Sequence, residues 1–138
     1  MACSHRLDRI PSDLMGAPRF ELLRVWRATI NTSNGLAFAI SSERAIREEL
    51  AAVALALPLG CLIGGTNLRR VELVALVILV LVVELLNTAI EKLADRITTD
   101  FDPQIGRVKD MGSTAVGVLL VMAGVFWLFA IAERFHLF

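Results

Sequence analysis

The chain has 138 residues, which is the size of a single domain. Hydrophobic residues make up 56% of the sequence and the mean hydropathy is +0.65, both above the usual range of soluble globular domains. The formal net charge is zero at pH 7, which argues against a nucleic-acid-binding protein. The composition therefore predicts a small membrane protein.

The N-terminal part of the chain divides into an extension and a surface helix. Residues 1–19 contain two prolines and a glycine and are predicted to be poorly ordered. At about residues 20–40 the pattern becomes helical, with an apolar face that includes Trp26 and arginines toward the other side. Such a pattern is typical of an amphipathic helix that lies in the membrane surface. The pair Asn34-Gly35 indicates a turn near the end of this segment.

Three apolar runs follow, and each is close to the roughly 20 residues that cross a bilayer as a helix. They occupy residues 50–68, 71–90 and 112–132. With their flanking residues they predict an all-α membrane domain over residues 20–138, with transmembrane helices at about 43–68, 71–97 and 107–133. Arg69 and Arg70 alone separate the first two runs, so a tight hairpin is expected there.

The basic residues predict the orientation in the membrane. Seven arginines precede the first apolar run, and residues 92–109 contain four Lys or Arg side chains. The opposite side holds three arginines. Because positive residues are retained in the cytoplasm, the N-terminus and the connection between the second and third helices are expected to be cytoplasmic.

The second apolar run carries a polar stripe. Glu84, Asn87, Glu91 and Asp95 fall on one face of a helix at about 100° per residue. A carboxylate in hydrocarbon costs several kcal/mol, so these groups are expected to meet a metal, a partner or a substrate. A row of helix–helix hydrogen bonds is the alternative, although neutral side chains serve that purpose at lower cost.

The remaining chemistry-bearing residues are carboxylates and cations near the same membrane surface. The sequence lacks a phosphate-binding G-x-x-x-x-G-K-[ST] loop, a dinucleotide-binding motif and the protein-kinase motifs. Carboxylates one to two helical turns apart suit Mg²⁺, and Lys109 beside Asp110 offers a cation for a phosphate. Spacing alone leaves two interpretations open: phosphoryl transfer, or a polar seam for assembly.

Two sequence strings favour phosphoryl transfer. VELLNTAIEKLADRI at residues 83–97 and GRVKDMGSTAV at residues 106–116 resemble the signature of the small prokaryotic diacylglycerol kinase family. The resemblance extends over about residues 20–135 and includes Arg24 and the Glu43-x-x-x-Arg47-x-Glu49 pattern. It implies a homotrimeric lipid kinase of the bacterial inner membrane that uses ATP and Mg²⁺, with active sites between subunits.

The resemblance also implies residue roles. Glu84 corresponds to the general base, and Glu43 and Glu91 correspond to the ligands of the metal that bridges the ATP phosphates. Residues that correspond to nucleotide-contacting positions are Arg24, Asn31, Glu43, Asn87, Glu91, Asp100, Phe101, Asp102, Lys109 and Asp110. Residues that correspond to positions in contact with the lipid substrate are Arg24, Arg47, Glu49, Arg70, Glu84, Ser113 and Trp127.

The lipid substrate has two candidates. A related branch of the family phosphorylates undecaprenol, whereas the KDMGS string and residues 46–49 look more like the diacylglycerol branch. The family commonly has aromatic residues where this chain has Asn31, Ser33 and Ile40, so adenine stacking at Asn31 is not expected. A non-catalytic membrane subunit, whose polar stripe drives oligomerisation or lines an ion path, is the alternative from another class.

Overall fold

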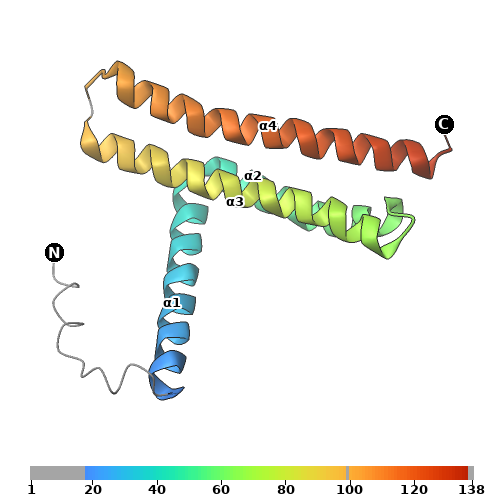
Figure 1. The fold of residues 1–138 in the computed structure, drawn as a ribbon, viewed down its shortest axis with the longest axis horizontal. Helices are drawn as coiled ribbons and strands as arrows, with labels where there is room; N and C mark the ends of the chain where they lie inside the picture. Colours follow the sequence, from blue (N-terminus) through green and yellow to red (C-terminus); the bar gives the residue numbers. More distant parts are fainter. Residues whose placement is uncertain (1–17, 99, 137–138) are drawn as a thin grey trace. The chain divides into compact units, whose positions relative to one another are not determined.

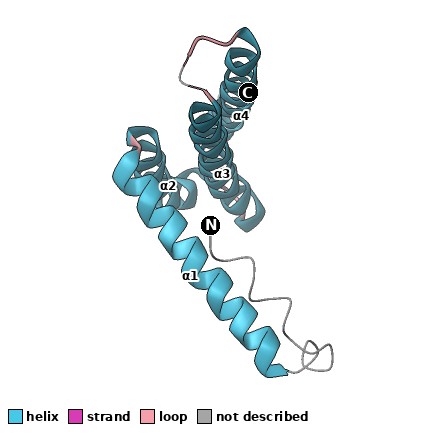
Figure 2. Cartoon of the chain, turned by 90° about the vertical axis from the view of Figure 1, so that its left-hand side faces the viewer, coloured by secondary structure: helices cyan, strands magenta, loops and turns pink. Residues whose placement is uncertain are grey.

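Four helices make up the described part of the protein. The structure is a computed structural model that describes residues 18–98 and 100–136. The helices are α1 (Pro18–Ser42), α2 (Arg44–Ile63), α3 (Asn67–Ile97) and α4 (Pro103–Arg134). The described residues contain helices and short loops and no strand, as the all-α prediction requires (Figure 2). Residues 1–17 of the predicted extension lie outside the described residues.

Helix α1 forms a unit of its own, and α2, α3 and α4 form a second unit. The predicted turn at Asn34-Gly35 is wrong, because α1 continues through both residues. A glycine inside a helix costs only about 1 kcal/mol relative to alanine, so one Asn-Gly pair is not enough to end a 25-residue helix. The hydroxyls of Thr29, Thr32 and Ser33 donate to the backbone carbonyls four residues earlier, so they are also satisfied within the helix.

Helix α3 is the centre of the second unit and packs against both α2 and α4. Consecutive helices run antiparallel, so that α3 and α4 lie side by side along most of their length (Figure 1). The start of α2, the end of α3 and the start of α4 therefore lie at one end of the unit. We call this the 43/95 end. The end of α2, the start of α3 and the end of α4 lie at the other.

The connection between α2 and α3 differs from the prediction. Helix α2 ends at Ile63, and Arg69 and Arg70 lie in the first turn of α3 instead of forming the turn. The Thr66 side chain accepts a hydrogen bond of 3.2 Å from the backbone N–H of Arg69, which caps the new helix. The turn therefore occupies residues 64–66, a few residues earlier than the charges suggested.

Helix α4 also begins earlier than the predicted residue 107. Asp102 is its N-cap, and its Oδ1 accepts hydrogen bonds from the backbone N–H groups of Gln104 and Ile105 at 2.7 and 3.3 Å. Pro103 follows at the first helical position, where its missing N–H costs nothing. Asp102-Pro103 therefore marks the start of the helix, and the apolar run 112–132 begins between two and three turns later.

The core between α3 and α4 is small and apolar. Val80, Leu119 and Ala123 form a buried cluster, with Leu76 and Val83 packed against it. Between α2 and α3 the backbones approach closely at Gly60, where an added Cβ would lie 3.1 Å from Cγ2 of Val74. Small residues at such contacts let helices approach without a large apolar core, as in membrane bundles.

Two of the described helices are long and apolar enough to cross a membrane, namely α3 and α4. Many of their large apolar side chains face outward, which is typical of a surface that contacts lipid or a partner. Helix α2 has four charged side chains in its first turns, and its apolar part from Leu50 to Ile63 is about 21 Å long. Of the three predicted membrane spans, the structure supports α3 and α4, and α2 stays a prediction.

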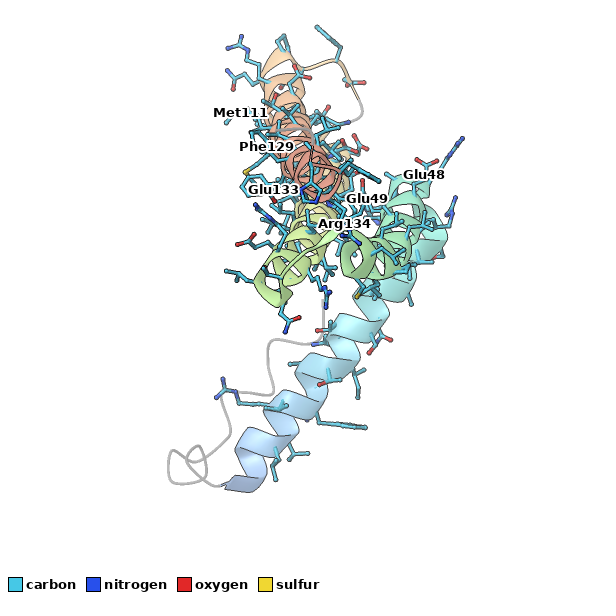
Figure 3. The ribbon with its side chains drawn as sticks, turned by 90° about the vertical axis from the view of Figure 1, so that its right-hand side faces the viewer. Glu48, Glu49, Met111, Phe129, Glu133 and Arg134 are labelled. Atoms are coloured by element: carbon cyan, nitrogen blue, oxygen red, sulfur yellow. The ribbon has the colours of Figure 1, made fainter. Side chains whose placement is uncertain are left out.

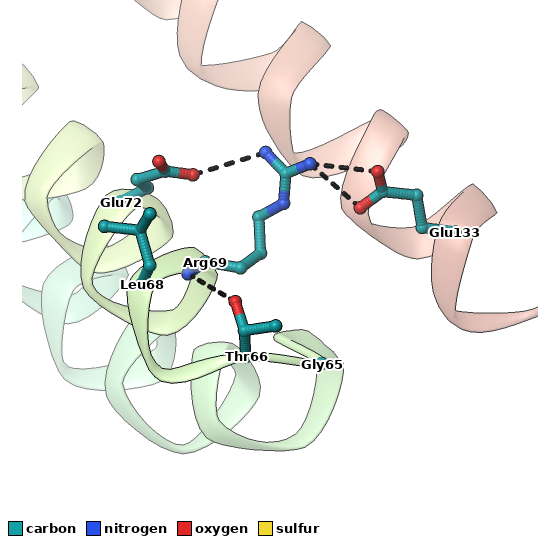
Figure 4. A pocket seen from close by; sticks show the side chains of 6 residues that line it. All are labelled: Gly65, Thr66, Leu68, Arg69, Glu72 and Glu133. Atoms are coloured by element: carbon teal, nitrogen blue, oxygen red, sulfur yellow. Dashed lines mark hydrogen bonds and ion pairs between the residues drawn. The ribbon is translucent and has the colours of Figure 1, made fainter.

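An ion-pair network joins α3 and α4 at the end opposite the 43/95 end. Nη2 of Arg69 lies 2.9 Å from Oε1 of Glu133, and Nη1 lies 3.3 Å from Oε2 of Glu72 (Figure 4). The network lines a shallow pocket together with Gly65, Thr66 and Leu68. It fixes the start of α3 against the last turn of α4.

We expect the Arg69–Glu133 pair to contribute measurably to stability. Because both side chains remain partly exposed, the coupling energy in a double-mutant cycle of Arg69→Ala and Glu133→Ala should be about 0.2–1 kcal/mol. The measurement is the free energy of unfolding in detergent micelles. Arg70→Ala combined with Glu133→Ala is the control, because Arg70 bonds to Gly64 and Asn67 instead. Equal coupling energies in both cycles would contradict the assignment.

Candidate active site

The 43/95 end brings together acidic and basic side chains of α3 and of the starts of its two neighbours. Glu43 precedes α2, Glu84 and Glu91 lie on α3, and Lys109 lies on the first turns of α4. The connections are short, so antiparallel packing alone brings these segments together. This end is where the polar stripe of α3 meets side chains from its neighbours.

An ion pair joins the start of α2 to α3. Nζ of Lys92 lies 2.6 Å from Oε1 of Glu43. Glu43 is the N-cap residue of α2, but its side chain makes no capping hydrogen bond and turns to Lys92 instead. The hydrogen bond from Lys92 lowers the pKa of Glu43 below its ordinary value, so this carboxylate stays ionised at neutral pH. Glu43 is therefore held beside the Glu91–Lys92 segment of α3.

Asn87, Glu91 and Glu84 form the α3 side of the site. Nδ2 of Asn87 donates a hydrogen bond of 3.2 Å to Oε1 of Glu91, one turn further along. Asn87 is buried, whereas Glu84 and Glu91 are half-buried. Glu84 lies two helical turns before Glu91 on the same helix. Two members of the predicted stripe, Asn87 and Glu91, are thus directly linked.

A second ion pair joins α4 to α3. Nζ of Lys109 lies 2.8 Å from Oδ1 of Asp95. Asp110 is exposed, and its backbone carbonyl accepts a 2.7 Å hydrogen bond from Thr114. The Ser113 hydroxyl bonds to the carbonyl of Lys109 at 3.2 Å. Lys109 and the stripe of α3 are therefore in contact through Asp95, the last member of the stripe.

The carboxylates do not form a complete metal site by themselves. Among the residues that the structure describes, no group of three or more His, Cys, Asp or Glu side chains could hold a metal ion. Mg²⁺, however, commonly takes only one or two carboxylates and completes its octahedron with waters and substrate phosphates. An ionised Glu43 held beside Glu91 offers hard oxygen donors of this kind. The donor set fits Mg²⁺ that arrives with a nucleotide.

The loop between α3 and α4 holds three of the expected nucleotide contacts. Phe101 is 95% exposed, and Asp100 and Asp102 are exposed as well. The backbone N–H of Asp100 donates to Oγ1 of Thr98 at 3.1 Å. The Asp102 side chain caps the N-terminus of α4, so in this structure it stabilises the start of that helix.

Other expected site residues are distributed over α1 and α2. Arg24 and Asn31 are exposed residues of α1, the separate unit. Arg47 and Glu49 lie in the first turns of α2, where Arg47 is exposed and Glu49 half-buried. Figure 3 shows Glu49 beside Glu48 at this start of α2. Arg47 and Glu49 therefore share the 43/95 end with Glu43.

Two expected lipid-contacting residues lie at the opposite end of the helices. Arg70 is fourteen residues before Glu84 on α3, or about 21 Å away along the helix axis. Its Nε donates to the carbonyl of Gly64 at 3.0 Å. Nε1 of Trp127 donates to the carbonyl of Leu73 at 3.3 Å. The structure does not bring Arg70 or Trp127 together with the carboxylates, and both contact backbone carbonyls instead.

Lys92 is the site residue that the sequence reasoning missed. It follows Glu91 in the sequence, and its side chain is rotated by about 100° around the helix axis. It therefore lies outside the predicted stripe. One signal was available: the chain contains only two lysines, and both occur in the strings that resemble the family signature. In the structure each of them pairs with a carboxylate at the 43/95 end.

Known proteins resemble this chain over most of its length. Residues 31–131 match the profile of the family described as prokaryotic diacylglycerol kinase. The chain is 38% identical over 112 residues to a diacylglycerol kinase of Escherichia coli K12, which covers 81% of this chain and 92% of that protein. Diacylglycerol kinases of Haemophilus influenzae and Pseudomonas aeruginosa are each 34% identical over 106 residues, 77% of this chain and 90% and 86% of theirs.

We expect Lys92→Met to raise the pKa of Glu43 toward its ordinary value of 4.5, because the donor that lowers it is removed. In the unaltered protein the lowered pKa gives stability above pH 4.5 that is lost as the pH falls through the folded-state value. The variant should lack this pH-dependent contribution. Carboxyl ¹³C NMR in micelles measures the pKa, with Lys109→Met as the matched control. An unchanged Glu43 titration in Lys92→Met would show that Lys92 does not control it.

Proposed function

Because the chain belongs to the prokaryotic diacylglycerol kinase family, we propose that it transfers the γ-phosphoryl group of ATP to the primary hydroxyl of diacylglycerol. The product is phosphatidic acid, made at the cytoplasmic face of the bacterial inner membrane. The observation that carries this proposal is the meeting of carboxylates from two helices at the 43/95 end. The Glu43–Lys92 ion pair joins Glu43 to the residue that follows Glu91, and Glu84 lies two helical turns before Glu91 on α3.

The depth of the carboxylates along α3 supports a site at the membrane interface. Glu84 precedes Glu91 by seven residues, two helical turns or about 10 Å. Glu91 lies toward the end of α3 and next to charged neighbours, whereas Glu84 follows the apolar run 73–83. A lipid hydroxyl that arrives from the bilayer meets Glu84 first, and a nucleotide that arrives from water meets Glu91 first. The two substrates then approach each other along one helix face.

Glu84 is the proposed general base. Its carboxylate accepts the proton of the lipid hydroxyl while the hydroxyl oxygen attacks the γ-phosphorus, and ADP leaves with the electrons of the broken P–O bond. A carboxylate in a poorly solvated position is suited to accept a proton near neutral pH. Phosphoryl transfer needs little covalent help from the protein, so positioning and charge neutralisation supply most of the catalysis.

Glu43 and Glu91 are the proposed ligands of Mg²⁺. When bound, the cation neutralises charge on the β- and γ-phosphates during transfer. Asn87 holds the Glu91 carboxylate by its hydrogen bond, and Lys92 keeps Glu43 ionised. Lys109 is proposed to move from Asp95 to a phosphate oxygen when the nucleotide binds, and Arg24 is proposed to reach the phosphates from α1.

The remaining proposed contacts are secondary. The loop residues Asp100, Phe101 and Asp102 are proposed to border the nucleotide, and Asn31 and Asp110 are further proposed nucleotide contacts. Arg47, Glu49 and Ser113 border the lipid headgroup. Because Arg70 and Trp127 lie about 20 Å further along α3 and α4, they are proposed to meet the acyl chains or the far interface.

We propose a homotrimer with sites between subunits, because a single chain of this size has little surface to enclose ATP, a metal and a lipid. The described residues of one chain lack a three-ligand metal cluster, and α4 exposes an apolar surface that includes Val118 and Val121. A neighbouring subunit that packs there would supply the missing walls. In the full assembly α2 is the third proposed membrane span, and the N-terminus is cytoplasmic.

Undecaprenol is the alternative lipid, since the same base and metal ligands serve a different alcohol. Purified protein in mixed micelles should transfer ³²P from ATP to diacylglycerol faster than to undecaprenol. Glu84→Gln keeps the size of the side chain but cannot accept a proton, so its rate should fall by about 10² or more. Glu48→Gln is the control, because Glu48 is an exposed glutamate paired with Arg44. Near-normal turnover by Glu84→Gln would remove Glu84 from the role of base.

Subunit mixing tests the shared site. Glu84→Gln and Lys109→Ala proteins, each inactive, are combined during reconstitution. If the two residues act from different subunits, mixed trimers regain a substantial fraction of the wild-type rate. Differently tagged subunits that co-purify prove the mixing. Proven mixing without any recovered activity would mean that Glu84 and Lys109 act from the same chain.

A further inference from the structure

Gly112 is the point of closest approach between α4 and the polar stripe of α3. A Cβ added at Gly112 would collide with Oδ1 of Asn87 and would lie 3.4 Å from its Cγ. At three other glycines of the same helix, Gly106, Gly117 and Gly124, an added Cβ meets nothing within 4 Å. The close contact is therefore specific to the position opposite Asn87.

The amide of Asn87 has a defined orientation at this contact. A carboxylate is only a hydrogen-bond acceptor when ionised, so the NH₂ group of Asn87 must face Glu91 and the oxygen must face α4. Oδ1 of Asn87 is buried and has no hydrogen-bond partner among the described residues. The oxygen lies against the bare Cα of Gly112, and the nitrogen donates to Glu91 at 3.2 Å.

We propose that Gly112 is a positioning residue for the active site: its missing side chain lets α4 hold the Asn87 amide in the orientation that binds Glu91. This inference rests on the proposed role of Glu91 as a metal ligand. Asn87 then acts on the metal through Glu91, and Gly112 acts through Asn87. Groups that orient a metal ligand typically change metal affinity by 10–100-fold when they are lost.

A methyl group at position 112 has a preferred way to be accommodated. Rotation of the short Asn87 side chain moves a few atoms, whereas separation of α3 from α4 breaks the packing of Val80, Leu119 and Ala123. Rotation removes the hydrogen bond to Glu91 while the helices stay in place. The expected defect of Gly112→Ala is therefore weaker metal binding in a folded protein.

The test compares Gly112→Ala with Gly124→Ala, twelve residues further along the same helix, where an added Cβ meets nothing within 4 Å. One readout is the side-chain amide resonance of Asn87 in ¹⁵N NMR, which needs no catalysis. The other is Mn²⁺ affinity in the presence of ATP, measured by electron paramagnetic resonance. Gly112→Ala should shift the amide resonance and weaken Mn²⁺ binding about 10-fold or more. Gly124→Ala should leave both unchanged.

A double-mutant cycle with Asn87→Ala separates this role from a general packing defect. In the Asn87→Ala protein the space beside residue 112 is empty, so Gly112→Ala should add less than a twofold further loss of Mn²⁺ affinity. If Gly112→Ala does not fold, the double variant should fold, because the colliding atom is gone. A fully additive loss, a double variant that also fails to fold, an unshifted Asn87 amide or unchanged Mn²⁺ affinity each overturns the proposal.

The proposed function fails separately from this inference. If the wild-type protein transfers no phosphate to either lipid, the kinase proposal is wrong. The Asn87 resonance and the Mn²⁺ titration still decide whether Gly112 orients Asn87 toward Glu91.

Discussion

The packing of α3 between α2 and α4 determines which polar groups of this protein meet. Because both neighbours run antiparallel to α3, the start of α2 and the start of α4 are brought to the end of α3. Two ion pairs, Glu43–Lys92 and Asp95–Lys109, then join α3 to each neighbour at that end. The contacts between helices in the candidate site depend on this arrangement, since the residues concerned come from separate parts of the chain.

The charged residues of α3 lie on either side of an apolar segment. Between Leu73 and Val83, α3 carries only apolar side chains, and a charge there would meet hydrocarbon or the small core. At one end Arg69 is neutralised by Glu72 and Glu133, a closed network that stabilises structure. At the 43/95 end each lysine pairs with one carboxylate, and Glu91 accepts a hydrogen bond from the neutral amide of Asn87.

Part of the fold and of the site could be read from the residues. Hydropathy indicated α3 and α4, and the spacing of Asn87 and Glu91 placed them on one face, as their hydrogen bond confirms. The turn predicted at Asn34-Gly35 was wrong because local turn propensity is weak beside continuous helix formation. The end of α2 was misplaced because Arg69 and Arg70 resembled a loop, whereas Thr66 caps a helix that includes them.

By itself, then, the sequence determined the class of protein, the family it resembles and the polar face of α3, since these depend on composition and on periodicity along one helix. Only the tertiary structure decided that Lys92 holds Glu43, that Lys109 reaches Asp95 and that Gly112 lies against Asn87. These contacts join residues on different helices. Their existence depends on the rotation and register of one helix against another, which side-chain packing sets and a linear pattern does not contain.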